Sequence, residues 1–179
     1  SVDFYRLQRE GNSTFHIGTT QVSQKADSTF NSLSIDLGGK LVRHDLNILM
    51  EESGSKCNLN GLYVLVNDQH VDNQTFVDHA QPHTTSQQYY KGVVSGHSKT
   101  VFNGRVLVRK DAQGTDAQQS NKTLTLSDHA KVASKPQLEI YADDVKCNHG
   151  AAIGQLDPGS LFSLKTRGLD DNAARTLLE

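Results

Sequence analysis

The sequence changes character along one stretch, Tyr141-Ala142-Asp143-Asp144-Val145-Lys146-Cys147-Asn148-His149-Gly150-Ala151-Ala152. Before it, short apolar and β-branched runs are broken by glycines, asparagines and charges, a pattern typical of strands and turns. After it comes the only segment with a clear helical signature. Cys147 and His149 stand two residues apart, and residues i and i+2 of a strand point to the same face. The stretch therefore places a thiol beside an imidazole at the end of a β-rich unit.

The strands expected before this stretch show alternation with period two. In residues 30–37, Leu33 and Ile35 fall on one face, while Ser34 and Asp36 fall on the other. Residues 41–50 continue with the same period after the turn that a pair of glycines predicts. We expect the core of the protein to stack leucine, valine and isoleucine side chains inward.

Short apolar cores recur along the chain at an average spacing of roughly fifteen residues, longer than a hairpin arm and shorter than a βαβ unit. They lie at Tyr63–Val66, Phe76–Val77, Val93–Val94, Val106–Val108, Leu124–Leu126, Leu138–Tyr141 and Ala151–Ile153. No helical pattern separates them. The spacing fits the coils of a solenoid, and it fits an antiparallel sandwich or barrel equally well. Both alternatives predict an all-β protein.

Helical signals begin at Asp157, an N-cap residue followed by a proline at the first helical position. Gly168 suits the end of this first helix, and a second helix is expected from Asp170 onward. We therefore expect a core domain over residues 1–154 and the start of a helical region over residues 155–179. Because the helical pattern is still running at Glu179, the sequence has the appearance of a fragment of a longer protein.

Composition excludes several classes of function. The 179 residues carry 18 basic and 20 acidic side chains, without a basic stripe that would indicate nucleic-acid binding. No apolar run approaches the length needed to span a membrane. The two cysteines, Cys57 and Cys147, lie far apart in the sequence, so a reducing compartment fits better than a disulfide.

Candidate chemistry is concentrated at Cys147 and His149, which supply two arms of a soft metal site but not the four ligands that a closed site needs. From spacing alone, a buried cysteine and a hydrogen-bonded histidine are the simpler interpretation. We interpret residues 79–83 as a polar turn with exposed imidazoles, and Asp143-Asp144 as a solvated turn. The sequence contains no phosphate-binding loop, nucleophile elbow or Cys-x-x-Cys motif, so we expect a protein that is not an enzyme.

Several ordered stretches together resemble a known family. They are Asn60–Tyr63 with His70–Asp72, then Val77–Ser86 running on to Tyr90–Val94, then Phe102–Gly104, Lys135–Ala151, Gly154–Asp157 and Ser163–Gly168. In this order they resemble the SufB/SufD scaffold family of iron–sulfur cluster assembly, from about Gly38 to Gly168. Lys146-Cys147-Asn148-His149-Gly150-Ala151 is similar to the SufD branch, because the SufB branch typically carries Glu-His-Glu at this point.

The resemblance implies a right-handed parallel β-helix core followed by a short helical segment. It implies a SufB-like partner subunit and a SufC-like ATPase docked on the C-terminal helices, in the cytoplasm. An iron–sulfur cluster would be held transiently and shared with the partner, with Cys147 and His149 as ligands and no cofactor in the isolated chain. We expect partner contacts from Tyr141 and Val145 at the end coil and from Leu161, Phe162 and Leu164 in the first helix. Without its partner, the exposed end coil is expected to form a homodimer.

A protein of another class competes with this interpretation. A β-helix polysaccharide lyase or carbohydrate-binding solenoid would use surface carboxylates and basic residues on the same scaffold. The absence of tryptophan and the aromatic content of only 6% argue against it, because sugar sites commonly rely on aromatic side chains.

Overall fold

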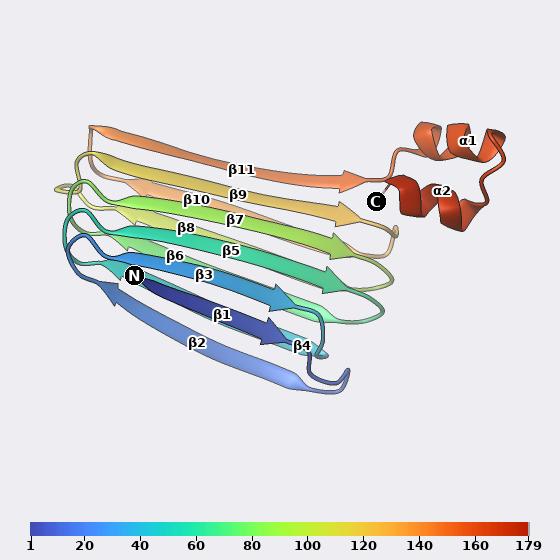
Figure 1. Cartoon of the computed structure of the whole chain (residues 1–179), viewed down its shortest axis with the longest axis horizontal. Coiled ribbons are helices and arrows are strands. Elements are labelled where there is room, and N and C mark those ends of the chain that lie inside the picture. The colour runs from blue at the N-terminus through green and yellow to red at the C-terminus, as the bar shows by residue number, and fades with distance from the viewer. Residues whose placement is uncertain (179) are drawn as a thin grey trace.

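The computed structural model describes residues 1–178 and contains eleven strands followed by two helices. The six odd-numbered strands form one sheet, called here the first sheet, in the order β1 (Val2–Gln8), β3 (Thr29–Asp36), β5 (Lys56–Leu65), β7 (Thr85–Val94), β9 (Thr115–Thr125) and β11 (Val145–Gln155). The five even-numbered strands form the second sheet, made of β2 (Phe15–Gln24), β4 (Leu41–Met50), β6 (His70–His79), β8 (Lys99–Val108) and β10 (Lys131–Ile140). The chain thus alternates between two sheets (Figure 1).

Every pair of neighbouring strands is parallel, which identifies the fold as a β-solenoid. Lys56 pairs with Thr85 and His70 with Lys99, so that one complete turn of the solenoid takes 29 residues there. The apolar cores predicted from the sequence recur at about half of this repeat. Each apolar core therefore corresponds to half a turn of the solenoid. Of the two alternatives that the spacing left open, the solenoid is confirmed and the antiparallel sandwich is wrong.

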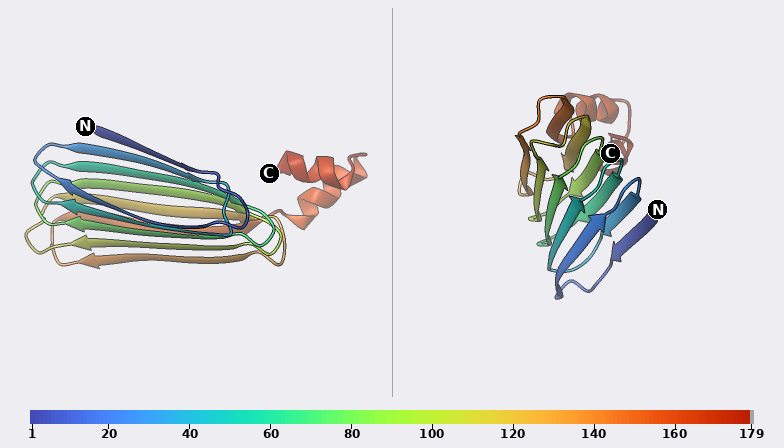
Figure 2. Two further views of the ribbon diagram at one scale, coloured as in Figure 1. Left: turned by 90° about the horizontal axis from the view of Figure 1, so that it is seen from below. Right: turned by 90° about the vertical axis from the view of Figure 1, so that its left-hand side faces the viewer.

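The core lies between the two sheets, whose strands run in opposite directions (Figure 2). In β4 the alternation predicts the buried face correctly, because Leu46, Ile48 and Met50 all point inward and are buried. Two tyrosines fill the centre, since the ring of Tyr63 lies over Gly92 and the ring of Tyr90 lies over Gly61. The Tyr63 hydroxyl donates to Asn121 Oδ1 at 3.0 Å, which satisfies its buried polar group.

The expectation that leucine, valine and isoleucine stack inward is wrong for β3. There the polar residues Ser32, Ser34 and Asp36 are buried, and Asp36 is only 1% exposed. Its carboxylate is held by the Arg6 guanidinium of the neighbouring strand at 2.7 Å. Burial raises the pKa of Asp36, whereas Arg6 acts to lower it. The burial of Asp36 is tolerated because Arg6 pairs with its charge inside the first two coils.

The turn after β6 also differs from the expectation. His79 is not exposed but is the fully buried last residue of β6, where its ring contacts the Thr84 and Ser86 hydroxyls at 2.7 and 2.9 Å. His83 is exposed, as expected, in a left-handed backbone conformation. The pair Asp143-Asp144 lies in the turn between β10 and β11, as the sequence predicts.

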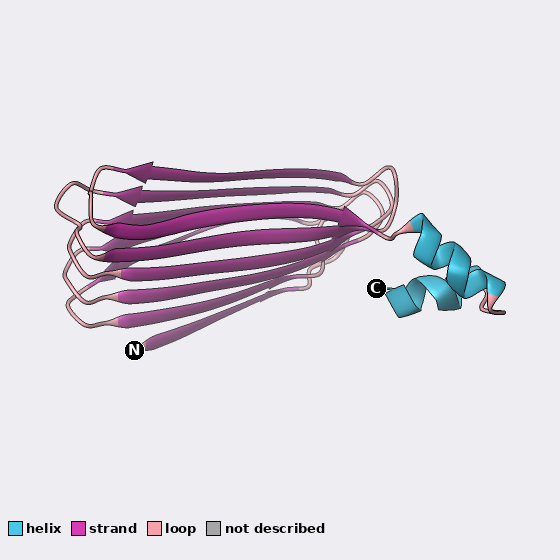
Figure 3. Ribbon diagram, turned by 90° about the horizontal axis from the view of Figure 1, so that it is seen from above, coloured by secondary structure: helices cyan, strands magenta, loops and turns pink. Residues whose placement is uncertain are grey.

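The helices begin where the sequence signals place them. Helix α1 (Pro158–Thr166) starts after Asp157, whose side chain accepts from the Ser160 backbone N–H, and α2 (Asp171–Leu178) starts after Asp170. Gly168 adopts the left-handed conformation that ends α1. Both helices project beyond the end of β11 rather than covering it (Figure 3). Glu179, the last residue of the expected helical region, lies outside the described residues.

Within residues 1–178, no helix combines the length and apolar character required to cross a membrane.

Replacement of Gly92 by alanine should destabilise the protein by about 1–3 kcal/mol, because the added methyl group would overlap the buried Tyr63 ring. The matched control is Gly150→Ala in β11, where a β-carbon meets nothing within 4 Å. Urea unfolding followed by circular dichroism measures both variants. Equal stability of the two alanine variants would contradict the tyrosine packing described here.

Two buried histidines should make stability depend on pH. Burial lowers the pKa of both His44 and His79 from 6.5 to about 4, so the folded chain leaves them neutral where the unfolded chain binds protons. The free energy of unfolding should therefore be highest above pH 6.5 and fall as the pH drops toward 4, by up to about 3 kcal/mol for each histidine. Urea unfolding at pH 7 and pH 5 measures the loss, and His44→Asn should reduce it. Identical urea midpoints at pH 7 and pH 5 would contradict the expectation that the two buried histidines make stability depend on pH.

Candidate functional site

The candidate site lies on the last coil of the solenoid, formed by β10 and β11. Each of these strands is an edge strand, because β10 pairs only with β8 and β11 only with β9. One side of each strand therefore carries backbone N–H and C=O groups without a neighbouring strand. Such open edges are ready to pair with strands from another chain.

Cys147 and His149 point to the same side of β11, as their spacing predicts. Cys147 pairs with buried Ala117 of β9, and His149 pairs with buried Gln119, so both side chains belong to the inward row. Along a strand, two such residues lie about 6–7 Å apart. Cys147 is half-buried against the core, whereas His149 is exposed at the open end.

The chemistry of this pair is that of an incomplete metal site. Sulfur and imidazole nitrogen are ligands suited to iron, zinc and copper. Among residues 1–178, no group of three or more histidine, cysteine, aspartate or glutamate side chains is placed to hold a metal ion. Cys147 and His149 are therefore two possible ligands without a third side chain of these types beside them in the described part of the chain.

The Cys147 thiol is kept in its protonated form. Burial raises its pKa, a hydrogen bond with the Ala117 backbone lowers it, and the nearby Asp116 carboxylate raises it further. Binding of a metal ion at the sulfur would have to release this proton. Cys57 lies in the same inward row, but Ser86 and Ala117 separate it from Cys147, so the two thiols are free and too far apart for a disulfide.

The residues expected to contact partners fall into two groups. Tyr141 is 65% exposed in the turn before β11, while Val145 is half-buried against the core. In α1, Phe162 is 68% exposed, and Leu161 and Leu164 are only half-buried. The three do not form one buried stripe, because Phe162 points to water.

Sequence reasoning missed the polar side chains inside the solenoid. Gln88 and Gln119 are both 2% exposed and line the row that ends at His149. Their role could not be recognised without the register, since the residues lie about 30 positions apart in the sequence. The signal that could have found them is a polar residue at an inward position of a period-two strand.

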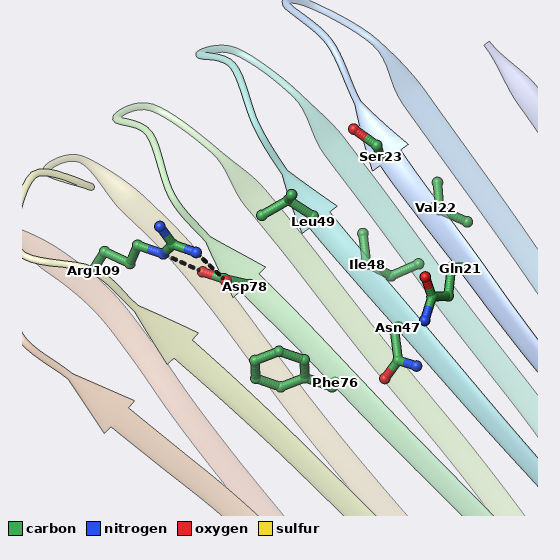
Figure 4. Close-up of a pocket in the computed structure, with 9 residues that line it drawn as sticks. All are labelled: Gln21, Val22, Ser23, Asn47, Ile48, Leu49, Phe76, Asp78 and Arg109. Atoms are coloured by element: carbon green, nitrogen blue, oxygen red, sulfur yellow. Dashed lines mark hydrogen bonds and ion pairs between the residues drawn. The ribbon is translucent and has the colours of Figure 1, made fainter.

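A separate groove of about 490 Å³ lies on the second sheet, over β2, β4 and β6, and not near the last coil (Figure 4). Phe76 and Leu49 line it, and Asp78 and Arg109 border it. The Asp78 carboxylate is bound by Arg109 through two hydrogen bonds of 2.9 and 2.7 Å. The ion pair fixes the Asp78 carboxylate and the Arg109 guanidinium to each other at the border of the groove.

Comparisons with known proteins place the whole chain in one family. Residues 1–179 match the family model described as SUF system FeS cluster assembly, SufBD core domain. The chain is 40% identical over 177 residues to an iron–sulfur cluster assembly SufBD family protein of Synechocystis, covering 99% of this chain and 39% of that protein. It is 35% identical over 173 residues to the iron–sulfur cluster assembly protein SufD of Escherichia coli, covering 97% of this chain and 41% of that protein.

A plant relative is similar to the same degree. The chain is 38% identical over 175 residues to the chloroplastic protein ABCI7 of Arabidopsis thaliana, covering 96% of this chain and 36% of that protein. The chain thus spans about two fifths of the length of the relatives it matches.

The two thiols should react very differently with a thiol reagent such as 5,5′-dithiobis(2-nitrobenzoate). Cys57 has no exposed surface and burial raises the pKa of its thiol to about 12, whereas Cys147 is partly exposed. We expect one slowly reacting thiol in the native chain and two in urea, because the thiolate is the reactive form. Cys147→Ser should abolish the native reaction. Reaction of both thiols in the native chain would contradict the placement of Cys57.

Proposed function

Because this chain belongs to the SufBD core family of the SUF iron–sulfur cluster assembly system, we propose that it is the core of a SufD-like scaffold subunit. In this role it works with a SufB-like subunit and a SufC-like ATPase and performs no catalysis itself. The observation that carries the proposal is the placement of Cys147 and His149 in the inward row of an uncapped coil. Two ligands beside two open strand edges suit a site completed by a second chain.

The partner subunit would pair with β10 and β11. Its strands would satisfy the open backbone groups of this coil and cover the apolar side chains of Ile153 and Tyr141. The partner's ligands would then complete the coordination of an iron–sulfur cluster, which is the cargo of the assembly and not a resident cofactor. When the partner is absent, the same edges would pair two copies of this chain as a two-fold dimer.

The ATPase would dock on the projecting helices. Phe162 supports this assignment, because a large exposed apolar side chain on a short helix is typical of an anchor residue in an interface. The two unpaired cysteines support a reducing compartment, which we take to be the cytoplasm.

His149→Ala should abolish cluster formation in the complex, because removal of one of two ligands leaves this chain with Cys147 alone. The complex with the SufB-like subunit and the ATPase is incubated anaerobically with ferrous iron and sulfide, and visible absorption and acid-labile sulfide report the cluster. The matched control is Asn148→Ala, whose side chain lies on the opposite face of the same strand, beside Gln118. Normal cluster formation by both His149→Ala and Cys147→Ser complexes would overturn the proposed site.

Phe162→Ala should weaken ATPase binding by roughly tenfold or more, as expected for an anchor residue of an interface. The melting temperature of the Phe162→Ala variant should equal that of the wild type, because Phe162 is not buried in the fold. Ser163→Ala, at the exposed neighbouring position, serves as the control. Titration of the ATPase with each variant measures the affinity, and equal affinity of the two variants would reject the docking role of α1.

A further inference from the structure

A row of buried polar side chains runs along the inside of the first sheet and ends at His149. Gln88 of β7, Gln119 of β9 and His149 of β11 are register partners in successive coils. The Thr75 hydroxyl donates to Gln88 Oε1 at 2.7 Å, and Gln119 Nε2 donates to the same oxygen at 3.3 Å. The two amides are therefore linked within the core, in line with the stacked coils.

The amide of Gln119 is held in one orientation. A β-carbon on Gly104, which faces it from β8, would overlap Gln119 Nε2, so the amide occupies the space that this glycine leaves. Nε2 is directed toward Gln88 of the preceding coil. Because the oxygen and nitrogen of an amide diverge from one carbon, Oε1 does not point at the Gln88 oxygen that Nε2 contacts.

This oxygen is buried and accepts no hydrogen bond in the structure. A buried acceptor without a donor costs about 1–3 kcal/mol, and such a group in a native protein requires an explanation. Gln88 Nε2 is likewise buried without a partner, but the amide of Gln88 presents its oxygen to Gln119, so we expect the donor in the coil stacked on the other side of Gln119.

The last coil offers few donors. Most of its inward side chains are apolar, namely Val132, Pro136, Leu138, Ile140, Val145, Ala151 and Ile153. Ser134 accepts a hydrogen bond from Asn121 Nδ2 at 2.8 Å and keeps its own O–H as a donor. Cys147 is the register partner of Ala117 and carries only a weak S–H donor. His149 is the register partner of Gln119, whereas Ser134 lies in the other sheet beside Phe102 and Gln155 lies six residues farther along β11.

We propose that Gln119 is the positioning residue of His149: its Oε1 accepts the N–H of the imidazole and leaves the other ring nitrogen free to bind iron. In this structure the ring is exposed and does not make this bond. The bond would form when the exposed side chain turns inward into another staggered rotamer. A ligating histidine commonly donates its second N–H to an oxygen acceptor, which fixes the tautomer and the direction of the ring.

The inference rests on the proposed function, because the free ring nitrogen has a role as an iron ligand only if the cluster forms at this site. The hydrogen bond itself is independent of iron. It places the metal-binding nitrogen at the open end of the coil, where ligands of the partner subunit would arrive. It also removes the unpaired acceptor from the core.

Nitrogen-15 NMR of the histidine side chains in the whole chain at pH 8 tests the bond without metal. In the wild type, the His149 N–H should give a visible signal protected from solvent exchange, with the proton on one nitrogen. In Gln119→Leu this signal should broaden by exchange and the proton should redistribute between the nitrogens. Gln119→Glu retains an acceptor and should keep the signal. Thr123→Val, which removes another buried hydrogen bond from β9 at the position paired with Ile153, should leave it unchanged.

An exchange rate and proton distribution equal in the wild type and Gln119→Leu would overturn the inference. In the complex, Gln119→Leu should lower the affinity for ferrous iron by about 10–100-fold, and Gln119→Glu should restore most of it. The two proposals fail separately. Normal clusters in both the His149→Ala and the Cys147→Ser complexes overturn the proposed function, whereas an unchanged NMR signal in Gln119→Leu overturns the positioning role.

Discussion

The structure depends on the stacking of parallel coils, in which each strand satisfies its backbone hydrogen bonds only through the coils on either side. This constraint builds the two sheets and the core between them. It also leaves the last coil unfinished, because β10 and β11 have neighbours on one side alone. The inward side chains of this coil line an open end. Cys147 is partly exposed and His149 is exposed for the same reason that the strand edges are open.

Stacking also explains how so many polar groups are buried. Residues at equivalent positions of successive coils lie about 4.8 Å apart, close enough for one side chain to bond the next. Gln88 and Gln119 form such a contact as a pair of amides, and Arg6 reaches diagonally to Asp36 in the next coil, two positions beyond its own register partner Ser34. A polar residue thus finds its partner roughly one turn away in the sequence. The inward side chains thus form rows that run from coil to coil. One of these rows, made of Gln88, Gln119 and His149, ends at the candidate metal site.

The extent to which the sequence predicted this arrangement follows from the range of each interaction. Local signals were sufficient for the β-structure, the helix start at Asp157 and the common face of Cys147 and His149. Alternation in β3 separated two faces correctly but could not tell which one is buried, because Arg6 neutralises Asp36 from another coil. His79 was taken for a turn residue, since its partners Thr84 and Ser86 follow beyond the turn. Gln119 became recognisable only through the register that pairs it with His149.

An incomplete ligand set suits a scaffold better than a complete one. Four protein ligands in one chain hold a metal tightly, whereas an assembly protein must release its cluster to an acceptor. In the proposed complex, ligands from two chains make cluster affinity depend on the contact between the chains, because a ligand that binds only the assembled state stabilises that state. Conversely, in the proposed complex a movement that separates the last coil of this chain from the partner subunit would lower the affinity for the cluster. Helices α1 and α2 follow β11 after a short connection, so in the proposed complex a movement of an ATPase docked on them would be passed to the strand that carries Cys147 and His149.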